Sequence, residues 1–358
     1  MESVWHIVGA SCQGANHIRS NLPNQDAISW QVSYPASYPF ILAVADGHGS
    51  AKSFRSHRGA QIAVRIANEV LMDLYFGTPG VISQLSSLKD TCENRVPDAL
   101  VARWRKRVSE DIARDPIAEE ELRLLEERDG QNSRTMVMDS GGILAYGATL
   151  LAVLIAEEYA LFLQLGDGDI FTVSEDGSVS RPLSGDPRLF ANETTSLCLK
   201  DAYKDFRVAF RVLGNAPPSL IFLSTDGYAN SYPNEAAFLE VPADYLKQVR
   251  YHGLRLIESE LAGWLEEVSK GGSGDDVTLG LIWRESATII QEDEAASTSP
   301  AEPLADHVAT ESPAVSESVH IKDSGGLEEG GDDKAKELGH GATPQVDVSN
   351  SSGTNPKG

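Results

Sequence analysis

Several aspartates of this chain stand at the ends of apolar stretches. The clearest is Asp46, which follows the run Phe40–Ala45 and begins the sequence Asp46-Gly47-His48-Gly49. A strand holds a side chain rigidly at its end while the following loop leaves it accessible. The other acids at comparable strand ends or turns, each beside a glycine or another small residue, are Asp26, Asp167, Asp226 and Asp275. Small neighbours let a backbone approach closely, so we treat the five acids as candidates for one shared site.

Converging carboxylates indicate a particular chemistry. Without a basic partner they repel one another and raise one another's pKa values. Hard divalent cations such as Mg²⁺ or Mn²⁺ relieve that repulsion, whereas the His and Cys ligands typical of zinc are not conspicuous here. Two such ions about 3.5–4 Å apart could hold and deprotonate a bridging water for in-line attack on a phosphate. One Asp-Gly pair is ordinarily only a turn, but its recurrence after apolar strands favours a site.

The composition narrows the class of protein. The net charge is −23, and residues 287–358, with fourteen acids and four basic residues, carry −10 of it. An acidic body argues against a nucleic-acid binder, which would show a basic surface. Cys12, Cys92 and Cys198 are odd in number and far apart, so neither a disulfide framework nor a zinc knuckle is indicated. We find no dimerisation signal and expect a monomer.

The sequence shows neither a signal peptide nor an apolar run long enough to span a membrane. Met1–Trp5 lacks the basic and apolar regions of a signal peptide. The longest apolar run, around Gly147–Ala156, is too short to span a bilayer. We therefore expect a cytoplasmic protein.

Alternating or continuous apolar runs predict the strands. We expect them at Val4–Ala10, Ala27–Val32, Phe40–Ala45, Gly147–Ala156, Tyr159–Leu165, Ile170–Val173, near Val179, and at Phe206–Leu213, Leu220–Ser224 and Val277–Trp283. Residues 27–45 should form an antiparallel hairpin. We interpret residues 147–179 as a β-meander with an acidic corner.

Helical periodicity appears in four places. Ile62, Ile66, Val70 and Leu74 recur every four residues until the Gly77–Gly80 stretch ends the pattern. Residues 98–128 predict a helix that Pro116 divides into two pieces. Residues 235–250 and 253–268 predict two more. Three polar stretches, 11–25, 128–142 and 181–206, are expected to be loops, the second mobile and the third a possible flap.

The two ends of the chain differ in composition. Residues 1–286 hold nearly all the apolar content and predict one catalytic domain. Residues 287–358 are rich in Glu, Asp, Ser, Thr, Pro and Gly and lack aromatic residues, so we expect a disordered acidic tail. A merely solvated tail is favoured over a regulatory or interaction role.

Six short motifs, in order, resemble those of the 2C-type metal-dependent serine/threonine protein phosphatases, the PPM family. They are Asn24-Gln25-Asp26, Ala45-Asp46-Gly47-His48-Gly49, Gly147-Ala148-Thr149-Leu150, Leu165-Gly166-Asp167-Gly168, Ser224-Thr225-Asp226-Gly227 and Asp275-Asp276-Val277-Thr278. The resemblance covers roughly residues 1–285. It implies an α+β fold, with a central β-sandwich of two antiparallel sheets flanked by pairs of antiparallel helices. It also implies hydrolysis of phosphoserine or phosphothreonine in a phosphoprotein through a bridging hydroxide activated by two Mg²⁺ or Mn²⁺ ions, with a Ser/Thr kinase as companion in signal transduction.

The resemblance assigns roles to the acids. Asp46 resembles the acid that bridges both ions, and the Gly47 carbonyl a further ligand. Asp226 and Asp275 resemble the ligands of one ion, and Asp26 an acid on the side of the other, acting through water. Asp167 resembles an acid that helps bind a third, weaker ion in bacterial members.

His48 stands where the family places a general acid for the leaving seryl or threonyl oxygen. The alternative is a turn histidine that bonds only to backbone. The family's phosphate-gripping arginine has two candidates in this chain, Arg19, seven residues before Asp26, and His17, nine before it. An arginine would bind phosphate in bidentate fashion, which favours Arg19 slightly.

Two residues depart from the family pattern. Asp169 replaces a cation beside Asp167, and Asp276 replaces the common asparagine beside Asp275. Asp276 could still orient its neighbour through hydrogen bonds. An alternative function is a catalytically weak pseudophosphatase that binds a phosphoprotein or a partner kinase. Retention of the acids and of His48 argues against that alternative.

Overall fold

The computed structural model describes residues 4–33, 37–77, 85–183, 195–214 and 216–285. Ten strands within these ranges form two five-stranded sheets in which every neighbouring pair is antiparallel. The first sheet has the order β1-β10-β9-β6-β7 and the second β2-β3-β4-β5-β8. The strands are β1 (Val4–Cys12), β2 (Ala27–Ser33), β3 (Ser37–Ala45), β4 (Leu150–Ile155), β5 (Tyr159–Leu165), β6 (Asp169–Val173), β7 (Val179–Ser180), β8 (Arg207–Val212), β9 (Leu220–Ser224) and β10 (Val277–Glu285).

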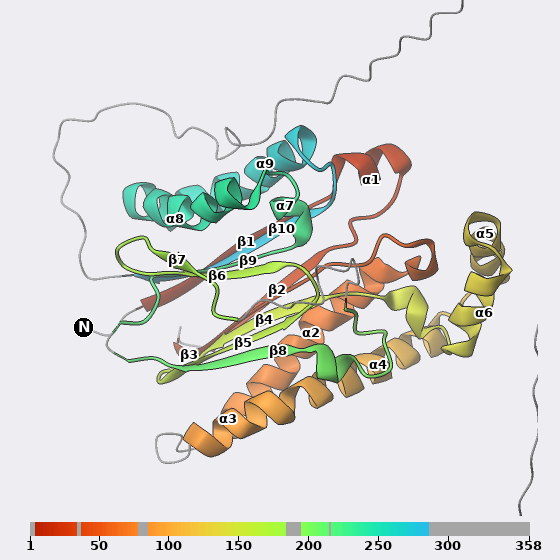
Figure 1. Ribbon diagram of the computed structural model, residues 1–358, viewed down its shortest axis with the longest axis horizontal. Coiled ribbons are helices and arrows are strands. Elements are labelled where there is room, and N and C mark those ends of the chain that lie inside the picture. The colour runs from red at the N-terminus through yellow and green to blue at the C-terminus, as the bar shows by residue number, and fades with distance from the viewer. Residues whose placement is uncertain (1–3, 34–36, 78–84, 184–194, 215, 286–358) are drawn as a thin grey trace, which may run out of the picture. The chain divides into compact units, whose positions relative to one another are not determined.

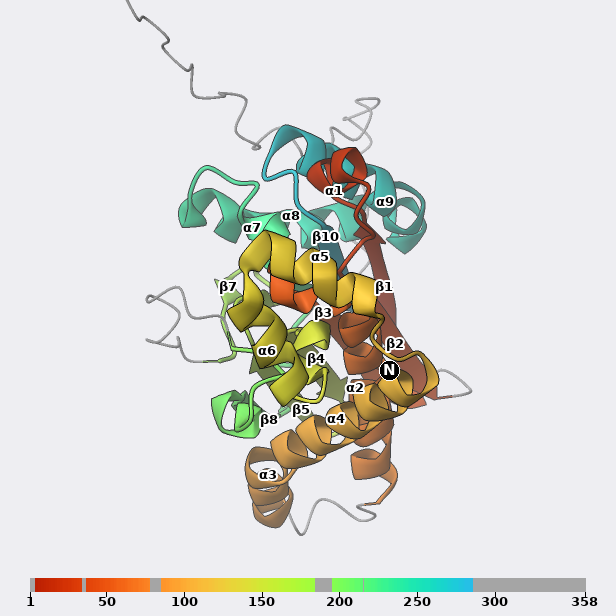
Figure 2. The same cartoon turned by 90° about the vertical axis from the view of Figure 1, so that its right-hand side faces the viewer.

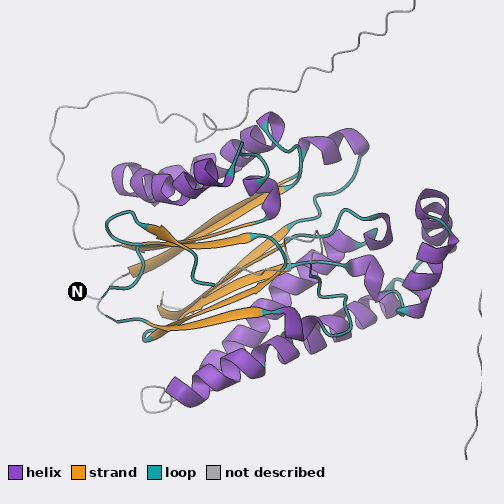
Figure 3. Cartoon of the chain, viewed as in Figure 1, coloured by secondary structure: helices purple, strands orange, loops and turns teal. Residues whose placement is uncertain are grey.

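Helices cover the outer face of each sheet, as Figures 1 and 3 show. α2, α3 and α4 pack on the second sheet, and α8 and α9 on the first. The helices are α1 (Ala15–Ser20), α2 (Ser56–Phe76), α3 (Leu85–Asn94), α4 (Val96–Arg114), α5 (Glu119–Asp129), α6 (Gln131–Asp139), α7 (Asp226–Ala229), α8 (Glu235–His252) and α9 (Leu254–Gly271). The α+β sandwich expected from the sequence is therefore confirmed.

β3 shows why its sequence is continuously apolar. Leu42 and Val44 point into the core between the sheets, where they join Ile221 and Ile282. The alternate residues, Ile41, Ala43 and Ala45, belong to the core under α2 and α4. A strand buried on both faces needs apolar residues at every position. The strand that ends at Asp46 is thereby held from both sides.

The predicted β-meander is wrong in its pairing. β4 and β5 pair in the second sheet, whereas β6 and β7 pair in the first. The chain crosses between the sheets at Gly166, whose φ of +104° disfavours other residues, and at Gly168. A Cβ on Gly168 would lie 2.6 Å from the Ser224 carbonyl oxygen. Alternation within each strand carries no information about which sheet it joins.

Two of the expected loops contain helices. Residues 128–142 include α6, which buries only Ser133 and Val137 and leaves Met136 and Met138 exposed among polar residues. Residues 11–25 include α1, which has no buried residue and ends at Asn21 with a φ of +53°. Both helices are short, so their polar exposed faces outweigh the periodic signal.

Two further predictions concern residues that lie partly or wholly outside the described ranges. Within 181–206, residues 184–194 lie outside those ranges, and a short 3₁₀ turn occupies Ala202–Asp205. The predicted acidic tail, 287–358, lies entirely outside them, so the proposed domain boundary stays a prediction. Among the helices of the described ranges, none combines the length and apolar composition needed to cross a membrane.

Candidate active site

A pocket of about 240 Å³ lies at the end of the sandwich where β3 and β9 end and β10 begins. α1 and the α5–α6 pair lie at this end of the molecule, which faces the viewer in Figure 2. The residues lining the pocket are His17, Gln25, Asp46, Gly47, His48, Gly49, Asp167, Asp226, Asp275 and Asp276. Seven of the nine residues proposed from the sequence are therefore brought together here. Asp26 and Arg19 are not among the lining residues.

Asp46 is held by hydrogen bonds to the segment before β4. Its N–H donates to Thr149 Oγ1 at 2.9 Å, and its carbonyl oxygen accepts from the Thr149 N–H at 2.8 Å. Gly47 then bridges to Ala148. A Cβ on Gly47 would lie 2.6 Å from the Gln25 carbonyl oxygen, so only glycine fits without movement of the backbone. The Thr149 hydroxyl was missed from the sequence, although it belongs to one of the family motifs.

Three carboxylates converge in the pocket. Asp46, Asp167 and Asp226 each offer an oxygen that lies within 4.8 Å of the others. Burial, followed by the charges of Asp26 and Asp226, raises the pKa of Asp46 well above its usual value. Burial and the charge of Asp167 likewise raise the pKa of Asp226, whose Oδ2 accepts from Asn230 Nδ2 at 3.0 Å.

This donor set fits hard divalent cations. Of the described residues that line the pocket, none is a lysine or an arginine. The basic residues of the lining are the two histidines, His17 and His48. All the converging carboxylate donors are oxygens, which Mg²⁺ and Mn²⁺ accept readily.

Asp26 lies behind the pocket, beneath the residues that line it, and is only 7% exposed. Its Oδ2 accepts from the hydroxyls of Thr225 and Thr278, each at 2.8 Å. Burial raises the pKa of Asp26 well above its usual value, while these two hydrogen bonds act in the opposite direction. Asp26 thus contacts the end of β9 and the start of β10, and its negative charge contributes to the raised pKa of Asp46.

His48 lines the pocket two residues after Asp46. Its N–H donates to the Gly147 carbonyl oxygen at 3.1 Å. Its ring lies against Gly147, where a Cβ would come within 2.8 Å of His48 Cδ2. Burial lowers the pKa of His48, and the charge of Asp167 opposes that effect. The imidazole therefore borders the pocket next to Asp46.

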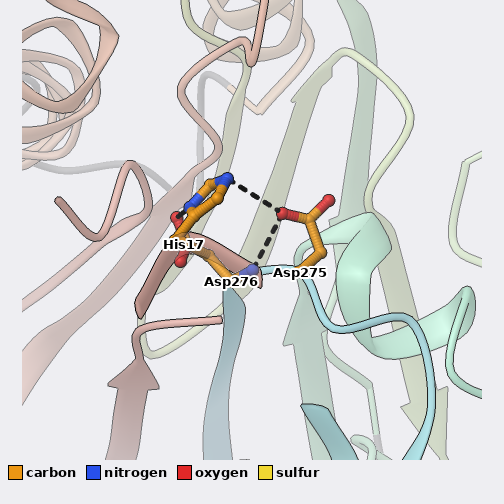
Figure 4. A group of neighbouring side chains, drawn as sticks. All are labelled: His17, Asp275 and Asp276. Carbon is orange, nitrogen blue, oxygen red and sulfur yellow. Dashed lines mark hydrogen bonds and ion pairs between the residues drawn. The ribbon is translucent and has the colours of Figure 1, made fainter. Parts of the chain in front are cut away.

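The two candidates for binding phosphate have different surroundings. His17 lines the pocket, with Nδ1 at 2.8 Å from Asp276 Oδ2 and Nε2 at 3.8 Å from Asp275 Oδ1 (Figure 4). Arg19 is exposed on α1 and donates to the Asn16 side chain. The slight preference for Arg19 does not match this arrangement, because the α1 helix turns Arg19 away from the lining.

Asp169 does not line the pocket. It is 7% exposed and pairs with Arg181, whose guanidinium lies 4.4 Å from the centre of the Phe171 ring. Burial raises the pKa of Asp169, and Arg181 counteracts that rise. The acid that replaces a cation in the family pattern thus has a cation of its own.

The model of the family described as protein phosphatase 2C matches residues 13–266. Similar solved structures include the catalytic domain of the serine/threonine phosphatase PstP with two manganese ions, 17% identical, covering 80% of this chain and all of that one, with a TM-score of 0.45. A serine/threonine phosphatase of S. agalactiae is 18% identical, covering 78% of this chain and all of that one, with a TM-score of 0.45. PppA of Pseudomonas aeruginosa is 16% identical. The match covers 79% of this chain and all of PppA, with a TM-score of 0.45.

A search of curated protein sequences finds no significant match. The structural likenesses are distant, and the family assignment rests on the sequence model. That model spans well over half of the chain and includes all the motifs from Asn24 to Asp226. The chain therefore belongs to the protein phosphatase 2C family, the metal-dependent serine/threonine protein phosphatases.

Proposed function

We propose that this chain hydrolyses phosphoserine and phosphothreonine in phosphoproteins, with divalent cations bound in the pocket at the end of the sandwich. The observation that carries the proposal is the convergence of Asp46, Asp167 and Asp226 in a lining without lysine or arginine. Such a cluster is costly for a folded protein unless cations offset the charge. A protein that only bound phosphoproteins would need the opposite charge.

We assign the pocket acids to two Mn²⁺ or Mg²⁺ ions and a weaker third. Asp46 would contact both principal ions, with the Gly47 carbonyl oxygen as a further ligand. Asp226 and Asp275 would hold one of them, and Asp167 the third. Asp26, which lies behind the lining, would act through water. The chemistry that two bound ions supply is activation of a shared water as the nucleophile.

The chain's own groups would handle the leaving oxygen. His48 stands two residues after Asp46 in the lining, where its imidazole can give a proton to the departing seryl or threonyl oxygen. Burial lowers the pKa of His48, which eases release of the proton and also reduces the fraction of His48 that carries it at neutral pH.

His17 is the better candidate for contact with the phosphate, because it lines the pocket and Arg19 does not. We place the catalytic domain in residues 1–286, with residues 287–358 as an acidic tail. A companion Ser/Thr kinase in signal transduction, a cytoplasmic location and a monomeric state remain predictions.

The test is hydrolysis of p-nitrophenyl phosphate and of phosphoserine and phosphothreonine peptides with Mn²⁺ or Mg²⁺. We expect Asp46→Asn to lower kcat/KM about a hundredfold or more, which corresponds to about 2.7 kcal/mol of transition-state stabilisation. Asp176→Asn is a matched control, since it changes another Asp-Gly turn that is exposed and outside the pocket.

Two results would contradict the proposal: no hydrolysis with either metal, or full activity in Asp46→Asn. Calorimetric titration with Mn²⁺ distinguishes an active phosphatase from the alternative, a pseudophosphatase. A pseudophosphatase would bind phosphopeptides without turnover and would bind Mn²⁺ weakly or not at all.

A further inference from the structure

We propose that Asp276 is a positioning residue that holds His17 with Nε2 toward the phosphate group of the substrate. This inference rests on the proposed phosphatase function and deepens it. Its starting point is that the two residues interact directly, with His17 Nδ1 2.8 Å from Asp276 Oδ2. The histidine at the phosphate-binding position and the aspartate at the usual asparagine position, two departures from the family pattern, are therefore partners.

Asp276 is a buried acceptor of three hydrogen bonds. It is 4% exposed. Its Oδ1 accepts from the Gly14 N–H at 2.7 Å, and its Oδ2 accepts from the Gln25 N–H at 2.6 Å. Together with His17, these donors come from the segment between β1 and β2, more than 250 residues before Asp276. One carboxylate therefore fixes both ends of that segment and the histidine within it.

The same contacts determine how the ring lies. An ionised carboxylate only accepts hydrogen bonds, so His17 Nδ1 must carry the proton that joins the ring to Asp276. His17 Nε2 is then left for the pocket. It lies 3.8 Å from Asp275 Oδ1, beyond hydrogen-bonding range (Figure 4). A phosphate group bound beside Asp275 would therefore meet the His17 ring at Nε2.

An asparagine could not take the place of Asp276 beside a histidine in this arrangement. Its amide has one acceptor oxygen and one NH₂ donor. With the amide NH₂ at the place of Oδ1, it would face the Gly14 N–H. With the NH₂ at the place of Oδ2, it would face the N–H groups of Gln25 and His17. Two buried donors facing each other lose their hydrogen bonds and destabilise the arrangement.

Packing alone does not set the rotation of the His17 ring. No residue of α1 is fully buried, although the His17 side chain itself is only 15% exposed. The other attachments of α1 are hydrogen bonds of its backbone, Ala15 N–H to Ser269 Oγ at 3.1 Å and Asn16 N–H to the Gly274 carbonyl oxygen at 2.8 Å. These fix the helix but not the rotation of the histidine ring. The ring orientation therefore depends on Asp276.

A double-mutant cycle tests the inference, using the full chain with Mn²⁺. The variants are His17→Ala, Asp276→Asn and the two combined. The measurements are kcat and KM for p-nitrophenyl phosphate, the inhibition constant of inorganic phosphate, and the Mn²⁺ dissociation constant by calorimetry. We expect each single variant to raise the phosphate inhibition constant about tenfold, in the range of a lost charge-assisted hydrogen bond. If Asp276 acts through His17, the double variant should be no weaker than either single one.

Asp111→Asn is the matched control. Asp111 is a buried carboxylate of α4 that accepts from Tyr146 Oη at 2.9 Å and pairs with Arg58 outside the pocket lining. Its loss should lower thermal stability and leave the phosphate inhibition constant unchanged. A general loosening of the fold would instead raise that constant in all the variants.

The outcomes separate the alternatives. Additive effects of the two substitutions would overturn the positioning role. A loss of Mn²⁺ affinity in His17→Ala that matches the loss of phosphate affinity would also overturn the inference, because the imidazole would then be a metal ligand. If the wild-type chain hydrolyses no phosphoester, the proposed function fails instead.

A second measurement needs neither turnover nor a folded Asp276 variant. NMR of wild-type protein labelled with ¹⁵N-histidine, with the His17 signals assigned by their absence in His17→Ala, reports which ring nitrogen is protonated. We expect a protonated Nδ1. An unprotonated Nδ1 would overturn the inference.

Discussion

Thr225 donates its hydroxyl proton to Asp26 Oδ2 at 2.8 Å, which joins two residues 199 positions apart in the chain. Thr225 Oγ1 also accepts from the Thr278 N–H at 3.0 Å, and the Thr278 hydroxyl donates to the same Asp26 oxygen. The start of β2, the end of β9 and the start of β10 thus meet at one buried carboxylate. These hydrogen bonds fix the backbone next to Asp226, which follows Thr225, and near Asp275, which precedes Thr278 by three residues.

Thr225→Val should destabilise the protein by about 1–3 kcal/mol, because a buried carboxylate loses a donor and the Thr278 N–H loses an acceptor. Urea unfolding measures the change. Thr172→Val is the control, since the Thr172 hydroxyl bonds to Ser180 at an exposed position. That change should stay within about 0.5 kcal/mol. Equal losses in both variants would refute a special role for the hydrogen bonds at Asp26.

Asp226→Asn should stabilise the metal-free protein while removing its response to Mn²⁺. The charges of Asp167 and Asp275 oppose ionisation of Asp226, so an uncharged amide relieves repulsion. We expect a gain of about 0.5–2 kcal/mol in EDTA, as is common where an active site is strained for function. Thermal unfolding with EDTA and with Mn²⁺ measures both effects. A variant less stable than wild type in EDTA would show that the acids do not strain the empty pocket.

Arg55 attaches the helical segment after α4 to the site end of the sandwich. It is 5% exposed, and its Nε and Nη2 donate to the two carboxylate oxygens of Glu121 at 2.7 and 2.6 Å. The guanidinium also donates to the carbonyl oxygens of Asp115 and Pro116 and to Tyr146 Oη. The sequence gives no sign of this arrangement, because an isolated arginine at the start of a helix is ordinarily exposed.

Arg55→Ala should cost about 1–3 kcal/mol, since it removes a buried guanidinium and leaves Tyr146 Oη and several partly buried acceptors without their donor. Arg55→Lys should recover only part of that loss, because an ammonium cannot reproduce the planar fork. Urea unfolding and limited proteolysis of residues 115–139 measure the effect. Arg123→Ala is the control: Arg123 pairs with Glu120 and Glu127 on the exposed face of α5. It should cost no more than about 1 kcal/mol.

Cys92 gives stability a dependence on alkaline pH. Burial raises the pKa of this thiol from 9.0 to about 12. Above pH 9 the unfolded chain loses the proton and the folded chain keeps it, so stability falls as the pH rises between these values. The thiol contributes a slope of up to about 1.4 kcal/mol per pH unit.

Cys92→Ala removes that slope. The difference in unfolding free energy between wild type and Cys92→Ala should therefore be constant from about pH 7 to 9 and shrink above it. In native protein, Cys92 should not react with Ellman's reagent below pH 9. A difference that stays constant up to about pH 10.5 would contradict a raised pKa for the buried thiol.

Much of the fold followed from local patterns. The continuous apolar runs of β3, β4 and β5 and the helical spacing in α2 and α9 reflect burial that repeats along each element. The Asp-Gly turns after β3 and β9 were visible for the same reason, since each acid directly follows a buried strand. Pro116 separates α4 from α5, as its restricted backbone requires. α2 ends before Gly77, which occupies the position that caps the helix.

Other features depended on contacts that no local pattern records. The sequence alone left Arg19 and His17 as alternatives, and the turn of α1 brings only His17 into the pocket lining. It also missed α6, because only Ser133 and Val137 of this short helix are buried and no apolar face repeats along it.

The sequence by itself therefore determined which residue types stand at strand ends, because side-chain alternation and turns are local properties. Only the tertiary structure decided which of those residues meet. It joined Asp276 to His17 across 259 positions and placed Asp26 behind the pocket, against Thr225. Such pairings arise from sheet order and register, and these follow from the packing of the whole chain.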